Sequence, residues 1–178
     1  GLLPEIATSM NISEPVAGHV ISAYALGVVI GAPLIAALTA RVSRKTILVS
    51  LMAVFTLGNI ATVAAPTYES LIAARFVAGL PHGAYFGVAG LVAASLVPPE
   101  RKGRAVAGVM LGLSVANVAG VPAATWLGQH AGWRSTFVAT AVIAAVTIAL
   151  VLAFVPHTPG NPDASGRSEA RAFFANRQ

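Results

Sequence analysis

Two side chains that can do chemistry, Arg75 and His82, lie in the apolar stretch ARFVAGLPHGAYFGVAG, which holds no other charge. Because a helix turns by about 100° per residue, their spacing puts them about 20° apart on one helix face. An arginine about 9 Å inside a membrane-spanning helix costs about 2.5–3.5 kcal/mol if it faces lipid, and a water-filled cavity or a buried partner lowers that cost. Arg75 therefore predicts a role in substrate binding or proton coupling. The alternative is a structural cation bonded to helix carbonyls.

His82 and three further polar residues extend this hypothesis. An imidazole can carry a proton near neutral pH, but a neutral His82 bonded within the helix bundle is an equally open interpretation. Tyr24 and Asn117 can present polar groups to a cavity, although both residue types also form hydrogen bonds between membrane helices. Glu5 is the one acidic residue of the opening segment. We expect it at the outer membrane surface, with proton coupling as the alternative.

Several kinds of site are excluded by residue types and motifs that the sequence lacks. Without cysteine, the chain has neither a disulfide nor a thiolate metal site. It has no His-Glu-x-x-His pair, no Gly-x-Ser-x-Gly elbow and no paired carboxylates within an apolar run, which are the usual groups of an intramembrane enzyme. No basic stripe with interleaved aromatics supports nucleic-acid binding. We therefore expect no enzyme, no catalytic residue, no metal and no cofactor.

The composition indicates that the elements around these residues lie in a membrane. Of 178 residues, 56% are hydrophobic and 10% are charged, whereas a soluble domain has about 25% charged residues. Five apolar runs can each cross a bilayer as a helix of about 20 residues, and they lack the alternation of barrel strands. With residues 1–10 as the end of a first helix, they predict an all-α, polytopic bundle of six helices, the first of them partial. The runs are 16–40, 46–65, 68–97, 103–127 and 133–155.

Basic residues gather in alternate breaks between the runs and in the polar tail. The positive-inside rule puts these breaks in the cytoplasm, so both ends of the chain are expected there. The tail, residues 156–178, contains many polar residues, prolines and glycines, and we interpret it as the start of a cytoplasmic linker. The basic residues of this set are Arg41, Arg44, Lys45, Arg101, Lys102, Arg104, Arg167, Arg171 and Arg177.

Small residues in the run 103–127 predict close helix packing. Gly108, Gly112 and Gly120 are spaced at multiples of four residues, a seam that lets another backbone approach. We expect this helix to be packed on both sides. Pro122 interrupts the hydrogen-bond ladder, and together with the glycines it is interpreted as a hinge for conformational change.

Similar spacing indicates which other helices are buried. Glycines recur in the run 16–40, and Gly79, Gly83 and Gly87 recur in the run that holds Arg75. Both helices are expected to pack closely on neighbours. By contrast, threonines are the main polar groups along 133–155, so that helix is expected to face lipid.

Three motifs resemble those of the major facilitator superfamily of transporters. RFVAGLPHGAYFGVAG, residues 75–90, is similar to its fourth-helix motif, in which an arginine precedes a glycine by four residues. LTARVSRKTIL, residues 38–48, resembles its loop between helices two and three. GLSVANVAGVPAATWLG, residues 112–128, resembles the fifth-helix motif of its proton-coupled drug antiporters. The resemblance covers nearly the whole chain and favours the 12-helix exporters of arabinose-efflux and chloramphenicol-resistance type.

The resemblance implies the amino-terminal half of a transporter, with two six-helix halves that rock about a central site in the bacterial inner membrane. It implies proton-coupled export of drugs or other small molecules, as in antibiotic resistance, with the proton gradient as energy source and no cofactor. The implied partners are membrane lipid, a small-molecule substrate and the carboxy-terminal half, without which this half is expected to be inactive. A six-helix membrane scaffold or assembly partner that transports nothing is the alternative.

The loop motif departs from the family pattern at two positions. Ala40 stands where the family usually has an aspartate, and Ser43 replaces a glycine, so a gate paired through that aspartate is not implied. Arg41, Arg44 and Lys45 remain as a cytoplasmic gate loop and are expected to bond helix-end carbonyls or the other half. Membrane orientation and contact with anionic lipid are the alternative roles of these three residues.

Overall fold

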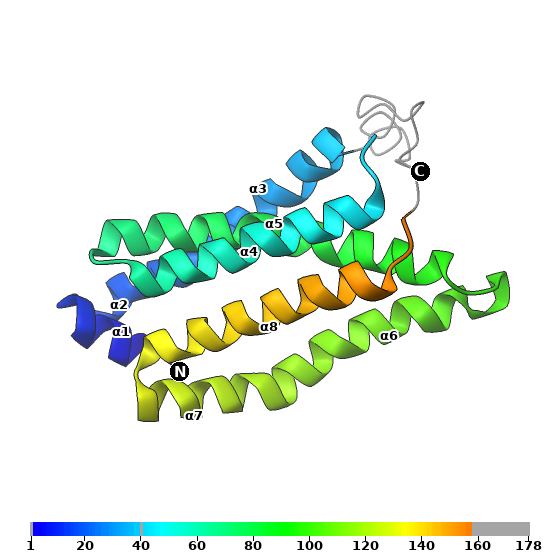
Figure 1. Cartoon of the computed structure of the whole chain (residues 1–178). Helices are drawn as coiled ribbons and strands as arrows, with labels where there is room; N and C mark the ends of the chain where they lie inside the picture. Colours follow the sequence, from blue (N-terminus) through cyan, green and yellow to red (C-terminus); the bar gives the residue numbers. More distant parts are fainter. Residues whose placement is uncertain (1, 40, 158–178) are drawn as a thin grey trace, which may run out of the picture.

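The computed structural model describes residues 2–39 and 41–157, and every regular element in these ranges is a helix (Figure 1). A 3-10 turn, η1 (Pro99–Arg101), precedes α6, and a π-helical segment, η2 (Ala116–Gly120), joins α6 to α7. The all-α, polytopic architecture expected from the sequence is confirmed. The α-helices are α1 (Leu3–Met10), α2 (Glu14–Ala17), α3 (His19–Thr39), α4 (Arg44–Ala64), α5 (Tyr68–Ser95), α6 (Lys102–Val115), α7 (Val121–Ala131) and α8 (Trp133–Phe154).

Five helical stretches in the described part of the chain are long and apolar enough to cross a membrane. They are Glu14–Thr39, Arg44–Ala64, Tyr68–Ser95, Pro99–Ala131 and Trp133–Phe154, and α1 lies before them as a helix of 8 residues. The fourth stretch is longer than the apolar run 103–127, because polar residues at both of its ends continue the helix. Of the polar tail 156–178, residues 158–178 lie outside the described residues.

Local sequence signals determine where several of these helices begin. Ser43 caps α4, since its side chain accepts a hydrogen bond from the backbone N–H of Thr46 at 3.2 Å. Thr67 and Ser70 form a reciprocal capping box at the start of α5. Gly132 separates α7 from α8 with a φ of 81°, a backbone conformation that favours glycine.

Helices α3 and α5 pack backbone against backbone. A Cβ placed on Gly79 would meet the carbonyl oxygen of Tyr24 and would lie 3.2 Å from the Cα of Gly27. A Cβ on Gly31 would lie 2.6 Å from the Cα of Leu80. Contacts this short leave no room for a side chain, so the glycines predicted to form a packing stripe bring these two helices together.

Helix α4 packs on both α5 and α8. Gly58 faces Ala78 of α5, where an added Cβ would lie 2.8 Å from the Ala78 side chain. The fully buried polar groups of this helix are bonded within it, because Asn59 donates to the carbonyl of Phe55 and Thr62 to that of Gly58, both at 2.8 Å. α4 therefore packs on both α5 and α8, and its two fully buried polar side chains are hydrogen-bonded.

The expectation that the run 103–127 is packed on both sides is wrong for the described residues. Nothing lies within 4 Å of a Cβ placed on Gly108 or Gly112, and α6 has no buried residue. Gly87 of α5 is equally open, and α8, which was expected to face lipid, buries five of its residues. In Figure 1, α8 lies between α4 and α7, and it packs on both. The physical reason is that small residues permit close approach but do not themselves specify which partner approaches.

Candidate functional site

Arg75 lies at the meeting point of three helices. Its guanidinium carbon is 4.4 Å from the centre of the Tyr24 ring on α3 and 4.9 Å from the centre of the Phe137 ring on α8. The Arg75 Nε is buried without a hydrogen-bond partner in the described part of the chain. The structure thus brings Arg75 and Tyr24 together, and within the described ranges Arg75 makes none of the carbonyl bonds that a purely structural cation would make.

Tyr24 also contacts His82, the other chemistry-bearing residue of α5. The Tyr24 hydroxyl and His82 Nδ1 are 2.8 Å apart and share a hydrogen bond whose direction depends on the imidazole tautomer. His82 stacks edge-on against Phe86, with ring centres 5.2 Å apart. We call Arg75, Tyr24 and His82 the Arg75 cluster, in which the phenol ring of Tyr24 touches both of the residues on α5.

The glycines of the α3–α5 contact position this cluster. Arg75, Gly79 and His82 lie within about 60° of one another around α5. The backbone of Tyr24 sits directly over Gly79, which has no side chain to keep it away. Tyr24 can therefore reach between the two polar residues, and a larger residue at position 79 would push it out.

Two members of the cluster, Arg75 and Tyr24, line an apolar cavity of about 390 Å³. Its walls come from α1, α3, α7 and α8 as well as α5, and they are mostly aliphatic side chains such as Leu3, Ile6 and Val121. Arg75 is the one charged side chain among the described residues that line it. Pockets of this kind, apolar with a few convergent polar groups, are where small molecules bind.

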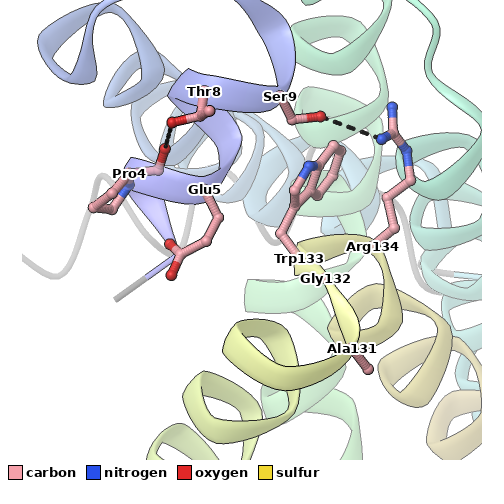
Figure 2. Close-up of a pocket in the computed structure, with 8 residues that line it drawn as sticks. All are labelled: Pro4, Glu5, Thr8, Ser9, Ala131, Gly132, Trp133 and Arg134. Atoms are coloured by element: carbon pink, nitrogen blue, oxygen red, sulfur yellow. Dashed lines mark hydrogen bonds between the residues drawn. The ribbon is translucent and has the colours of Figure 1, made fainter.

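Glu5 lines a different hollow, of about 640 Å³, between α1 and the α7–α8 junction (Figure 2). One of its carboxylate oxygens, Oε2, is buried without a hydrogen-bond partner in the described residues. Figure 2 shows Trp133 between Glu5 and Arg134. The structure therefore does not bring Glu5 into the Arg75 cluster or its cavity, and a role in proton coupling through that cavity loses its geometric basis.

Arg134 has a role that the sequence reasoning missed. Its Nε donates to the carbonyl of Val63 and its Nη2 to that of Ala65, both at 3.0 Å. Its guanidinium carbon lies 4.3 Å from the centre of the Trp133 ring. These bonds satisfy carbonyls at the end of α4 that have no partner within the helix. The available signal was that Arg134 is the one basic residue in the set of alternate breaks that otherwise holds Glu5, Glu14 and Glu69.

Asn117 is not part of the cluster. It is exposed in the π-helical segment η2, and its Nδ2 donates to the carbonyl of Leu113 in the preceding turn at 3.0 Å. The same segment ends at Gly120, two residues before Pro122, which lies in the first turn of α7. Because proline has no N–H, the α-helical ladder cannot continue through it, and the π-helical turn accommodates the interruption. The predicted hinge position therefore coincides with an irregular backbone.

The gate-loop residues lie between α3 and α4. Lys45 Nζ donates to the carbonyl of Leu152 at 2.8 Å, near the end of α8, which is the kind of helix-end bond expected for this loop. Arg44 is the first residue of α4, and Arg41 lies in the short turn before it. Ala40, where the family usually has an aspartate, lies outside the described residues. In the described ranges no group of three or more metal-ligating side chains is present.

Comparison with known proteins gives one family. The sequence matches the profile of the Major Facilitator Superfamily over residues 1–177. It is 47% identical over 156 residues to the Inner membrane transport protein YdhP of Escherichia coli (strain K12), and 44% identical over 156 residues to the Putative transporter AraJ of the same strain. Each alignment covers 88% of this chain and 40% of the relative.

A further relative comes from a different organism. The chain is 36% identical over 175 residues to a Chloramphenicol resistance protein of Streptomyces lividans. This alignment covers 98% of this chain and 45% of that protein. The chain therefore spans less than half the length of these curated relatives.

Proposed function

The chain belongs to the major facilitator superfamily, and from that premise we propose that it forms the amino-terminal half of a proton-coupled exporter of small molecules. The similar proteins are named as transporters, and one is named for resistance to chloramphenicol, which supports export as the direction. Because the chain spans less than half of their lengths, the activity would belong to a protein with a second, carboxy-terminal half.

The observation that carries this proposal is the Arg75 cluster at the edge of an apolar cavity. A cation inside a membrane-spanning helix is costly, and it is rarely present without a function. Here Arg75 makes no hydrogen bond with another described residue at its buried Nε, and it lines a cavity large enough for a small molecule. The geometry therefore favours a substrate site over a purely structural cation.

Tyr24 and His82 supply the atoms for a proton step. In the tautomer in which His82 Nδ1–H donates to the Tyr24 oxygen, the second imidazole nitrogen is available to accept a proton. A proton on His82 would add a second positive charge next to Arg75, since both contact the same phenol ring. Protonation of His82 and occupancy of the cavity beside Arg75 would therefore influence each other, which is the requirement for coupled transport.

Two features support alternating access about this site. The π-helical segment η2 and Pro122 interrupt the long helical stretch Pro99–Ala131 near the cavity wall, where Val121 lies. By contrast, Arg134 and Lys45 tie α8 to α4 through hydrogen bonds to backbone carbonyls. In such a bundle, α4 and α8 would move together as a rigid body. The helical stretch Pro99–Ala131 would bend at η2 and Pro122. The proposed setting is the bacterial inner membrane, with both chain ends in the cytoplasm.

The experiment is substrate flux by the full-length transporter reconstituted in proteoliposomes with an imposed pH gradient. Export driven by the gradient is expected for the wild type, and Arg75→Ala is expected to abolish it in protein that inserts normally. Arg104→Ala serves as the control, because Arg104 is exposed at the start of α6 and is remote in sequence from the cluster. Absence of gradient-driven flux across a broad panel of small molecules would overturn the proposal and favour a non-transporting scaffold.

A further inference from the structure

We propose that the substrates of this site are amphipathic organic anions, which Arg75 binds through their single negative group. The proposal rests on the proposed transport function and names the substrate class of the same site. Its starting point is the environment of the guanidinium. Tyr24 and Phe137 hold the group from two helices, with ring centres 4.4 Å and 4.9 Å from its central carbon.

The two rings orient the guanidinium but do not neutralise it. Aromatic faces attract a cation without using its N–H donors. The Nε of Arg75 is buried and has no hydrogen-bond partner in the described ranges. Because the rings use none of the N–H donors, an acceptor in the cavity that Arg75 lines would stabilise the site. The planar fork of N–H groups matches the two oxygens of a carboxylate, which would satisfy it better than a single neutral oxygen.

No acidic side chain of the described chain occupies that position. The described residues that line the cavity include no aspartate or glutamate. Glu5 lies in the separate hollow beside Trp133, as Figure 2 shows. The other glutamates of the described ranges, Glu14, Glu69 and Glu100, are each in the first turn of a helix. Within the described ranges, no carboxylate competes with a ligand for the Arg75 guanidinium.

The remainder of the cavity determines what else the ligand must be. The rest of the lining is mostly aliphatic, with Leu3, Val20 and Ala124 among its residues. The Thr125 hydroxyl is the one uncharged polar side-chain group in the lining besides the phenol of Tyr24, and that phenol is bonded to His82. A compact apolar body of aromatic-ring size fits a volume of about 390 Å³. A polyhydroxylated molecule would leave several hydroxyls without partners against this wall.

The test compares two ligands that differ in charge but hardly in shape. The purified full-length transporter is titrated calorimetrically with 4-isopropylbenzoate and with the neutral 4-isopropylbenzamide at neutral pH, where the first is ionised. The wild type is expected to bind the carboxylate at least about 10-fold more tightly than the amide, in line with the strength of charge-assisted bonds. Arg75→Gln is expected to remove this preference, and Arg75→Lys to retain part of it, because an ammonium keeps the charge but not the fork.

Two further variants keep the test decisive. Tyr24→Phe retains the ring next to Arg75, so it is expected to retain the preference for the carboxylate even if Arg75→Gln folds poorly. Arg104→Gln removes an exposed charge of the same kind and is expected to change nothing. Equal binding of the carboxylate and the amide by the wild type, equal losses of both in Arg75→Gln, or binding of neither would overturn the anion site.

The flux experiment separates this inference from the proposed function. Gradient-driven flux of neutral molecules without any preference for anions would overturn the substrate class while transport stands. Selective binding of the carboxylate without gradient-driven flux would overturn transport while the anion site stands. In the full-length protein, a carboxylate from another part of the chain that pairs with Arg75 would abolish the preference and so contradict the inference.

Discussion

Gly31→Ala provides a direct test of how the Arg75 cluster is positioned, because it acts on the α3–α5 contact without changing a polar side chain. The new Cβ would lie 2.6 Å from both the Cα and the carbonyl carbon of Leu80. Carbon atoms in contact are normally about 3.5 Å apart or more, and the carbonyl oxygen of Leu80 is closer still to the new Cβ, so the helices would have to separate locally by at least about 0.9 Å. Backbone atoms cannot rotate away as a flexible side chain would. The expected destabilisation is that of overpacking, about 1–3 kcal/mol.

The local separation of α3 and α5 should also displace Tyr24 within the Arg75 cluster. Tyr24 lies two turns before Gly31 on the same helix and depends on the close approach at Gly79 for its hydrogen bond with His82. Gly31→Ala is therefore expected to lower proton-coupled flux as well as stability. The matched control is Gly87→Ala on α5, where a Cβ would meet nothing within 4 Å.

The measurement is thermal or denaturant unfolding of the full-length protein in detergent, together with flux in proteoliposomes. Gly31→Ala should unfold more readily than the wild type, whereas Gly87→Ala should remain within about 0.5 kcal/mol, as substitutions away from packed contacts usually do. Equal stability and equal flux for the two variants would refute the backbone contact between α3 and α5 as the feature that positions Tyr24.

Three further substitutions test individual hydrogen bonds. Arg134→Gln should destabilise the protein by about 1.5–3 kcal/mol, because carbonyls at the end of α4 lose a charged donor, and Arg134→Lys should recover part of this in the same unfolding assay. Tyr24→Phe should cost about 0.5–1.5 kcal/mol and reduce proton-driven flux, since His82 loses its bond at Nδ1; unchanged flux would exclude Tyr24 from the proton step. Lys45→Met should lower stability by less than about 1 kcal/mol, because its bond to α8 is partly solvated, and a larger loss would show that the gate loop holds the bundle together.

The spacing along one helix could be predicted from the sequence, whereas contacts between helices could not. A separation of seven residues is enough to place Arg75 and His82 on one face of α5. That Tyr24 lies between them depends on how closely α3 approaches at Gly79, and that Phe137 covers the guanidinium depends on where α8 packs. Both are properties of the assembled bundle, and neither has a local signature.

The glycine seams show the same limit. Gly27, Gly31 and Gly79 form the predicted close contact, yet Gly108 and Gly112 have the same spacing and meet no other side chain or helix in the described ranges. Small residues lower the steric cost of approach equally in both places. Whether a glycine seam contacts another helix depends on which helices pack beside it. For the same reason, the sequence indicated the charge of Arg134 but not that this charge would cap α4.

Proton movement linked to substrate, followed in proteoliposomes that contain the full-length protein and a pH-sensitive dye, tests directly whether Arg75 takes part in coupled transport. We predict that adding a transported small molecule to wild-type vesicles changes the internal pH, and that Arg75→Ala abolishes this response while Arg104→Ala preserves it. An unaltered response in a normally inserted Arg75→Ala protein would contradict the account and make Arg75 a structural cation.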